Sequence, residues 1–303
     1  MRVSEIADRC GYEYCGEDLE VDSLRFAVCA GHNSIAIAQP ADCIGEIEAQ
    51  CILIQPALIN TDKTIIFAGD SIEYAAVKIA RLLQAEKGIR SRSVKYQQHD
   101  HYFIGEHTVI GKNTYVGPNA CIDDDVIIGD DCFIAPNVHI GTGTIIHNGV
   151  RIGSGSFVGS DSFYHYYDDG LQEFEGLGVT MIREGVSIGN NTTIQRGTFS
   201  DTIIGARSKI GNLIDIGHDV CIGHDCKIVS QTGIASNVKV GNYVTIYGQV
   251  GVANHVTIGD KAVVYAKSLV TKNVNAGKHV SGMYARDHIE ELRMQAKLKK
   301  RGG

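Results

Sequence analysis

The sequence contains two Gly-His-Asp phrases six residues apart, Gly217-His218-Asp219 and Gly223-His224-Asp225. An imidazole with an ordinary pKa of about 6.5 can take a proton from an attacking amine or hydroxyl near neutral pH. Asp219, Asp215 or a backbone carbonyl would orient the His218 ring for that task. Because 12 histidines occur, an ordinary surface histidine is nevertheless the better interpretation of His218 from composition alone.

The residues that must position these histidines form a six-residue repeat from Ile104 to Val270. An aliphatic residue returns every six positions, usually followed by Gly and preceded two places earlier by a small or β-branched residue. This period fits neither an amphipathic helix nor an alternating strand, but it suits a solenoid whose coils hold three short strands and three turns. The sequence therefore predicts a parallel β-helix with inward aliphatic residues and a rise of about 4.8 Å per coil.

Individual positions of the repeat carry further expectations. Glycine follows the inward residue, and we expect it there because a left-handed backbone at a turn is cheap for glycine. Cys132 and Cys226 fill the small inward position, which predicts packing rather than reactivity. The repeat places His218 at an outward, exposed turn and points His224 toward the next face of the coil. His255 is a third candidate for a substrate contact.

The repeat is interrupted twice. Between Val158 and Ile182 the phase is kept, yet residues 160–181 are rich in aromatic and acidic side chains, which predicts an extruded loop. A solenoid does not need such a loop for stability, so we interpret it as a small-molecule surface, with the cover of a neighbouring subunit as the alternative. The second interruption is a phase shift of four residues at Thr198–Thr202.

Composition argues against several classes of function. The net charge of −7 is opposed to a nucleic-acid partner, which would need a basic face. No apolar run reaches membrane-spanning length, and Met1–Ile6 carries charged residues where a secretory signal would be apolar, so we expect a cytosolic protein without a membrane span. The nine cysteines lack paired spacing, so reduced thiols are expected.

Two different segments flank the repeat. We expect a small α/β domain at residues 1–98, the β-helix domain at 99–275 and a helical segment at 276–303. The predicted elements outside the repeat are strands at Ile35–Ala38, Cys51–Ile54 and Thr64–Phe67, a helix from Ile72 to Gln84 capped by Asp70 or Ser71, and a helix over Asp287–Lys300 that would cap the open end of the solenoid.

Motifs along the whole chain resemble the UDP-3-O-acylglucosamine N-acyltransferases of lipid A synthesis. The most specific are Asn191–Gly197 and Asp201–Gly205, followed by Asn212–Asp219 where that family has its catalytic base. Val3–Ala7 and Tyr74–Ala80 resemble the uridine-binding domain of the same family. The resemblance therefore marks His218 as the candidate base.

This resemblance implies a left-handed β-helix and a homotrimer with active sites in the clefts between adjacent solenoids. His218 would deprotonate a sugar amine as it attacks an acyl thioester on acyl carrier protein, with a backbone amide stabilising the oxyanion. The residues expected around the substrate are Asp161, Phe163, His255, Asp215 and Asp219. Such direct transfer implies no metal and no tightly bound cofactor, with acyl-acyl carrier protein or acyl-CoA as the co-substrate.

Zinc held between subunits, as in the γ-class carbonic anhydrases that share this repeat, is the lesser alternative. The six-residue spacing of His218 and His224 differs from the spacing of the close histidine pair in that class. We therefore expect no metal site.

The chain departs from the resembling family at three places. Gln39–Asp42 stands where the family has an Asn-Pro-x-Tyr stretch that helps to hold uracil, so uracil stacking is in doubt. Asp161-Ser162-Phe163-Tyr164 replaces Asp-Gly-Phe-Gly, which predicts a different sugar pocket. Tyr265 and Lys267 add bulk beside the expected acyl tunnel and favour a shorter acyl chain.

We therefore expect an acyltransferase that acylates the amine of a nucleotide-linked amino sugar. A carrier-protein donor would need a basic surface, which Lys267, Lys272 and Lys278 would supply. One alternative is an acetyl-CoA-dependent N- or O-acetyltransferase of another glycan pathway, which suits the altered tunnel segment. The other alternative is a non-catalytic homologue that keeps the fold and a ligand loop.

Overall fold

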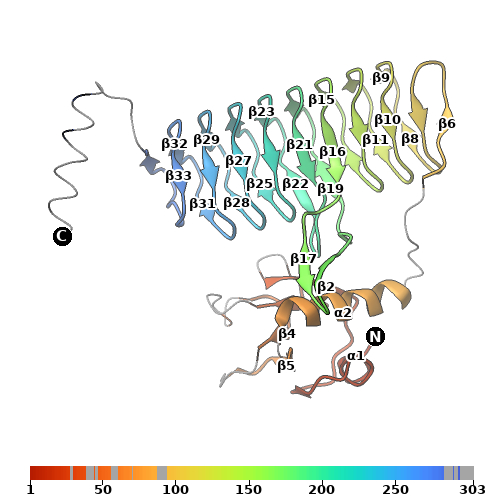
Figure 1. The fold of residues 1–303 in the computed structure, drawn as a ribbon, viewed down its shortest axis with the longest axis vertical. Helices are drawn as coiled ribbons and strands as arrows, with labels where there is room; N and C mark the ends of the chain where they lie inside the picture. Colours follow the sequence, from red (N-terminus) through yellow and green to blue (C-terminus); the bar gives the residue numbers. More distant parts are fainter. Residues whose placement is uncertain are drawn as a thin grey trace.

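The computed structural model describes residues 1–27, 30–38, 44, 47–55, 61–69, 71–86, 94–282, 289 and 293. It consists of an N-terminal α/β part and a long solenoid, joined midway by a hairpin (Figure 1). The predictions for Asp70 and Gln39–Asp42, and for the C-terminal helix apart from two positions, lie outside the described residues.

The solenoid is the predicted parallel β-helix, with three sheets that form its three faces. The first sheet contains β6 (Gln97–Gln98), β7 (Phe103–Ile104), β10 (Cys121–Ile122), β13 (His139–Ile140), β16 (Phe157–Ser160), β21 (Thr193–Gln195), β24 (Asp215–Ile216), β27 (Gly233–Ile234), β30 (Gly251–Val252) and β33 (Leu269–Val270). The second sheet contains β8 (Val109–Ile110), β11 (Ile127–Ile128), β14 (Ile145–Ile146), β19 (Thr180–Ile182), β22 (Thr202–Ile204), β25 (Cys221–Ile222), β28 (Lys239–Val240) and β31 (Thr257–Ile258). The third sheet contains β9 (Tyr115–Val116), β12 (Phe133–Ile134), β15 (Arg151–Ile152), β20 (Ser187–Ile188), β23 (Lys209–Ile210), β26 (Lys227–Ile228), β29 (Thr245–Ile246), β32 (Val263–Val264) and β34 (His279–Val280).

The register explains both interruptions of the repeat. Regular coils place hydrogen-bonded partners 18 residues apart, as between Ile122 and Ile140. Across the extruded loop the separation is 36 residues, so the insertion is one coil long and the six-residue phase survives. Between Ile194 and Ile216 the separation is 22 residues, because four extra residues leave the coil near Phe199.

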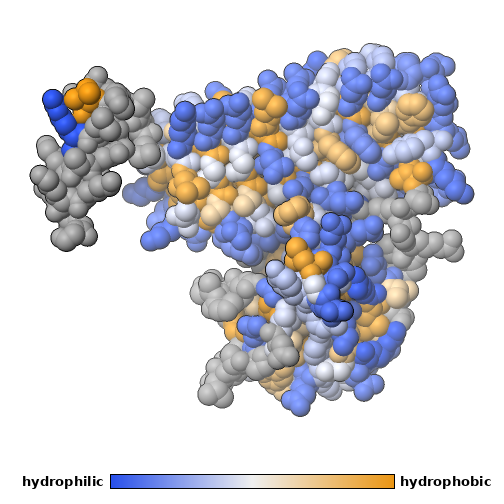
Figure 2. Space-filling model, in the orientation of Figure 1, coloured by the Kyte–Doolittle hydropathy of each residue, from blue (hydrophilic) through white to orange (hydrophobic). Residues whose placement is uncertain are grey.

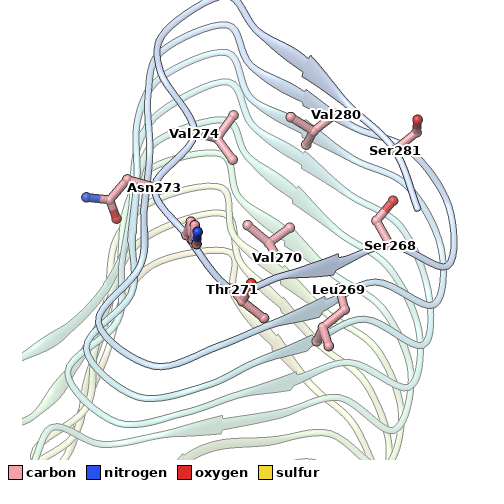
Figure 3. Close-up of a pocket in the computed structure, with 9 residues that line it drawn as sticks. Ser268, Leu269, Val270, Thr271, Asn273, Val274, Val280 and Ser281 are labelled. Atoms are coloured by element: carbon pink, nitrogen blue, oxygen red, sulfur yellow. The ribbon is translucent and has the colours of Figure 1, made fainter. Parts of the chain in front are cut away.

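The inward aliphatic residues form one continuous buried column from Val116 to Val274. Cys132 and Cys226 lie in it as free, buried thiols, and the Cys132 Sγ lies 3.2 Å from the carbonyl oxygen of His147. Both cysteines therefore pack as predicted. Figure 3 shows the last coils, where Val270, Val274 and Val280 line a pocket at the end of the column.

The expected reason for the repeat glycines holds at Gly159, whose φ is 86°, but is wrong for most of the others. The left-handed residue of a typical turn is two places later and is often Asn or Asp, such as Asn119 with φ 56° and Asp125 with φ 58°. Gly117 is needed for a different reason, because a Cβ there would lie 2.5 Å from the backbone nitrogen of Pro136 in the next coil. Close stacking of coils, rather than left-handed backbone, excludes a side chain at this position.

The N-terminal part is a five-stranded sheet with two helices. Its strands, in spatial order, are β1 (Tyr14–Cys15), β5 (Thr64–Phe67), β4 (Cys51–Ile54), β3 (Ser34–Ile37) and β2 (Ser23–Phe26), and its helices are α1 (Val3–Cys10) and α2 (Ile72–Glu86). β4 and β5 have the predicted bounds, and β3 begins one residue before its prediction. Ser71 caps α2 as expected, because its Oγ accepts the Tyr74 N–H at 3.2 Å.

The extruded loop forms an antiparallel hairpin of β17 (His165–Tyr167) and β18 (Leu171–Glu173). The hairpin leaves the middle of the solenoid and reaches α2 (Figure 1). Tyr166 in β17 is buried between the ring of Tyr74, with centroids 6.1 Å apart, and the guanidinium of Arg81 at 5.6 Å, both from α2. The loop therefore covers the N-terminal part of its own chain.

Within the described residues, no helix is both long and apolar enough to cross a membrane.

Candidate active site

His218 and Asp219 form a hydrogen-bonded pair in the turn after β24. The His218 Nδ1 lies 2.6 Å from the Asp219 Oδ2. Only 6% of His218 and 3% of Asp219 are exposed. The prediction of an exposed His218 is thus wrong. The ring lies outside the aliphatic column, as expected, but Tyr164 covers it edge-on with centroids 5.9 Å apart.

The four extra residues before β22 build a cradle for the Asp219 carboxylate. It accepts backbone N–H bonds from Thr198 at 2.9 Å, Phe199 at 3.2 Å and Ser200 at 2.6 Å. The Asp219 N–H in turn donates to the Thr202 Oγ1 at 2.9 Å. Three backbone N–H donors therefore fix the position of the carboxylate, whose two oxygens act as acceptors.

This arrangement selects the tautomer of His218. A carboxylate that only accepts requires the proton of a neutral ring to be on Nδ1, which leaves the Nε2 lone pair free. Among the described residues, Nε2 has no hydrogen-bond partner. The pair therefore presents a basic nitrogen, Nε2, on a ring that Asp219 orients through Nδ1. This is the geometry of a general base.

The other predicted site residues lie at different distances from this pair. Phe163 is 76% exposed and packs its ring against His165, with centroids 4.5 Å apart, while its N–H donates to the Gln195 Oε1 at 3.1 Å. Asp161 is also exposed. The ring contact of Phe163 is with His165 and not with His218, whereas Tyr164 of the same loop packs against the His218 ring.

Asp215 and His255 do not orient the base. Asp215 lies on the outward, exposed side of β24, where partial desolvation of the carboxyl by neighbouring groups raises its pKa. His255 lies in the same line of turns, two coils and about 10 Å from His218. Its ring meets Phe26 of the N-terminal part, with centroids 6.3 Å apart. Of the three predicted orienting groups, Asp219 makes the contact.

Sequence reasoning missed two residues that shape the site, Tyr164 and Phe199. Tyr164 packs against both His218 and Phe199, and burial raises the pKa of its hydroxyl. The sequence did hold a signal for Tyr164, because this large side chain stands where the resembling family has glycine. The signal for Phe199 was the four-residue phase shift. The repeat alone gave no reason to connect that shift with Asp219.

The second Gly-His-Asp phrase also forms a pair, with His224 Nδ1 lying 2.8 Å from Asp225 Oδ2. Here the carboxylate accepts from the Arg207 side chain, at 2.8 Å from Nε and 2.5 Å from Nη2. These contacts lower the pKa of Asp225 to about 2, chiefly through the Arg207 hydrogen bonds. His224 points elsewhere on the coil, as predicted, and in the described chain no three His, Cys, Asp or Glu residues gather as a metal site.

Comparison with known proteins supports the resemblance inferred from motifs. Residues 125–160 match the family model described as bacterial transferase hexapeptide (six repeats). The UDP-3-O-acylglucosamine N-acyltransferase of Rhizobium meliloti is 46% identical over 142 residues, which cover 44% of this chain and 40% of that protein. The enzyme of the same name from Rhizobium rhizogenes is 55% identical over 134 residues, or 44% of this chain and 38% of that protein. The aligned stretches thus span less than half of these relatives.

Solved structures share the fold. A UDP-N-acetylglucosamine acyltransferase of Francisella novicida has a TM-score of 0.56 at 25% identity and covers 65% of this chain and 72% of its own. The enzyme of that name from Campylobacter jejuni has a TM-score of 0.56 at 19% identity, over 66% of this chain and 82% of its own, and supports the fold alone. This chain is therefore a hexapeptide-repeat β-helix protein that is similar, over the aligned stretches, to the UDP-3-O-acylglucosamine N-acyltransferases.

Proposed function

We propose that this protein is an acyltransferase that moves an acyl group from a thioester to the amine of a nucleotide-linked amino sugar in lipid A synthesis, in the cytosol. The observation that carries the proposal is the His218–Asp219 pair, in which Nε2 has no hydrogen-bond partner among the described residues and the carboxylate is fixed by three backbone N–H groups. The N-acyltransferase names of the two relatives support transfer to an amine, and the name of the Francisella novicida structure supports acyl transfer to a UDP-linked sugar.

The reaction needs one base and one oxyanion donor. The amine nitrogen attacks the thioester carbonyl carbon while the His218 Nε2 takes an amine proton, and Asp219 stabilises the imidazolium that forms. A backbone N–H stabilises the oxyanion of the tetrahedral intermediate. The C–S bond then breaks, the C–N amide bond remains, and the imidazolium gives its proton to the departing thiolate. These steps use no metal and no tightly bound cofactor.

The acceptor would lie beside the small accessible part of the His218 ring, near Asp161, Phe163 and His255. The hairpin loop supplies the first two and the next coils supply the third. Lys267, Lys272 and Lys278 are exposed on the last coils, where a basic surface would receive the acidic acyl carrier protein.

We also propose that the protein acts as a homotrimer with sites between solenoids. The second sheet carries apolar residues on its outward side, which supports burial of this face against another subunit. Val109 is 58% and Ile127 48% exposed in the single chain, and Ile145, Met181 and Ile203 continue the same line. At the matching positions the third sheet carries Tyr115 and Phe133 on its first coils and then the polar residues Arg151, Ser187, Lys209 and Lys227. Figure 2 shows apolar surface across the middle of the solenoid, between hydrophilic edges.

A short-chain donor, acetyl-CoA, is the second candidate. Tyr265 and Tyr247 stack on the outside of successive coils, with centroids 5.7 Å apart and planes within 3°. Tyr265 belongs to the segment expected to border the acyl tunnel. The stacked tyrosine pair therefore favours a donor with a shorter acyl chain.

The test is thiol release from acyl carrier protein and CoA thioesters of several chain lengths, with a panel of UDP- and dTDP-amino sugars as acceptors. We expect sugar-dependent release that falls by about 100-fold or more in His218→Ala, because that change removes the base. His224→Ala is the matched control and should stay within about twofold. Full transfer by a folded His218→Ala protein would exclude this residue as the base, and silence of the wild type across the panel would favour the non-catalytic homologue.

A further inference from the structure

Strand β2 of the N-terminal part touches the cradle that holds Asp219. The Phe26 N–H donates to the Ser200 Oγ at 3.3 Å, and the Arg25 Nη1 lies 3.4 Å from the Asp201 Oδ2. The rings of Phe26 and Phe199 meet edge to face, with centroids 5.5 Å apart. Three consecutive cradle residues are therefore contacted by two consecutive residues of β2.

The same cradle residues face Asp219 with their backbone. Phe199 and Ser200 direct their N–H groups at the carboxylate and their side chains at β2. Asp201 is tied to both parts, since its Oδ1 accepts the Val179 N–H at 3.0 Å while its Oδ2 meets Arg25. A movement of β2 would thus be passed directly to the donors that position Asp219.

The middle of the cradle depends on contacts outside the regular coils. Its four extra residues lie outside the coil-to-coil register and lack the parallel ladder of the regular coils. Backbone bonds hold its two ends, where the Leu177 N–H donates to the Thr198 carbonyl at 2.7 Å and the Thr202 N–H donates to the Val179 carbonyl at 2.9 Å. Phe199 instead packs in an aromatic cluster with Phe26, Phe174 and Tyr164. A site built on a loop keeps reactive geometry only where packing and hydrogen bonds around it lock the loop.

We propose that Arg25 and Phe26 are positioning residues for the His218–Asp219 pair, which they hold in reactive geometry through the loop Gly197–Asp201. The inference rests on the proposed function for its kinetic consequence, and on the contacts of β2 for its structural one. The N-terminal part then has a role in catalysis, because the contacts of β2 with the cradle determine how well His218 is positioned and hence kcat.

The test compares Phe26→Leu and Arg25→Gln with Arg2→Gln, a control whose partner Asp18 lies elsewhere in the N-terminal part. We expect kcat to fall about tenfold in the first two variants, with KM for the thioester unchanged, because a small misplacement of the base is costly. The control should keep its kcat within about twofold. Arg25 is one-third exposed, so Arg25→Gln decides the question if Phe26→Leu does not fold.

A second readout is the Nδ1 proton of His218, observed by NMR in the resting protein. Asp219 from its own turn and Tyr164 from the hairpin loop face the ring. A loosened Asp219 lengthens the 2.6 Å hydrogen bond between Nδ1 and Oδ2, so the downfield resonance of this proton should move upfield in Phe26→Leu and Arg25→Gln and stay in place in Arg2→Gln.

Unchanged kcat and an unchanged His218 Nδ1 proton resonance in folded variants would overturn the proposal. A rise in KM for the sugar alone would also overturn it, since β2 would then be a binding element. The NMR measurement needs no substrate. If the wild type transfers no acyl group, the proposed function fails while the NMR result still decides whether β2 positions the pair.

Discussion

The two Gly-His-Asp phrases show how one local sequence acquires two different chemical settings. In both, the imidazole Nδ1 lies against the neighbouring carboxylate, at 2.6 Å in His218 and 2.8 Å in His224. Asp219 is buried and held by backbone N–H groups, whereas Asp225 meets an exposed arginine. The His–Asp contact is therefore set by the repeat, and its surroundings are set by what the chain places outside the repeat.

The partner of each carboxylate decides how firmly the histidine is held. Backbone donors of the cradle cannot rotate away, while Arg207 is a long surface side chain that is 60% exposed and screened by water. We conclude that the three-residue phrase alone does not make a base. The four extra residues at the cradle distinguish the two pairs.

The largest expected difference between the pairs lies in the carboxylates. Asp219→Asn should lower kcat by about 100-fold or more, because an amide no longer enforces the proton on the His218 Nδ1. Asp225→Asn should change kcat by less than about twofold. Steady-state kinetics of both variants with one donor and one acceptor make the measurement. Equal losses would show that the two pairs do the same work and would end the distinction.

A shortened turn should convert the first pair toward the second. Deletion of Thr198–Asp201 restores six-residue spacing between Ile194 and Ile204, so we expect the solenoid to fold while the cradle is lost. The kcat should fall by about tenfold or more, because Asp219 loses its backbone donors. Circular dichroism checks the fold beside the kinetics. Wild-type kcat in the folded deletion protein would mean that the cradle is dispensable.

The smallest expected effect concerns Arg207 and Asp225. The folded pKa of Asp225 is lowered to about 2, against about 3.9 for an unfolded aspartate. The pair therefore contributes stability that is fully present above pH 4 or so and is lost as the pH falls through about 2. Arg207→Gln should reduce this acid dependence, because the His224 hydrogen bond alone would then lower the pKa of Asp225. It should shift Tm by no more than about 2 °C at pH 7, because the pair is exposed. Melting curves of both proteins from pH 7 to pH 2 measure the acid dependence of Tm. A large loss of kcat in Arg207→Gln would contradict the view that the His224–Asp225 pair is not catalytic.

Much of the fold could be predicted from the sequence because the solenoid is local. Each inward aliphatic residue indicates the position of its own coil. In the N-terminal part, short apolar runs such as Cys51–Ile54 indicated β4 and β5. The candidate base could be placed at a turn by counting. Helix α1 was missed because Val3–Cys10 is short and its capping residue, Arg2, makes no side-chain cap.

The surroundings of the base could not be predicted, since they come from distant segments. The burial of His218 depends on Tyr164 from an insertion, and the cradle is braced by Phe26 from another sheet. No periodic pattern records such contacts. The glycine error has the same origin, because the close neighbour of Gly117 is in the next coil.

The long reach of β2 has a consequence for the order of folding. Coils of the solenoid join residues 18 apart and can add one after another, each on its neighbour. The hydrogen bond from Phe26 to Ser200 closes a span of 174 residues, and the Arg25–Asp201 contact one of 176. Contacts of such separation form late and slowly. A newly made chain should therefore complete its β-helix before the base is correctly held, so that gain of activity lags behind gain of secondary structure.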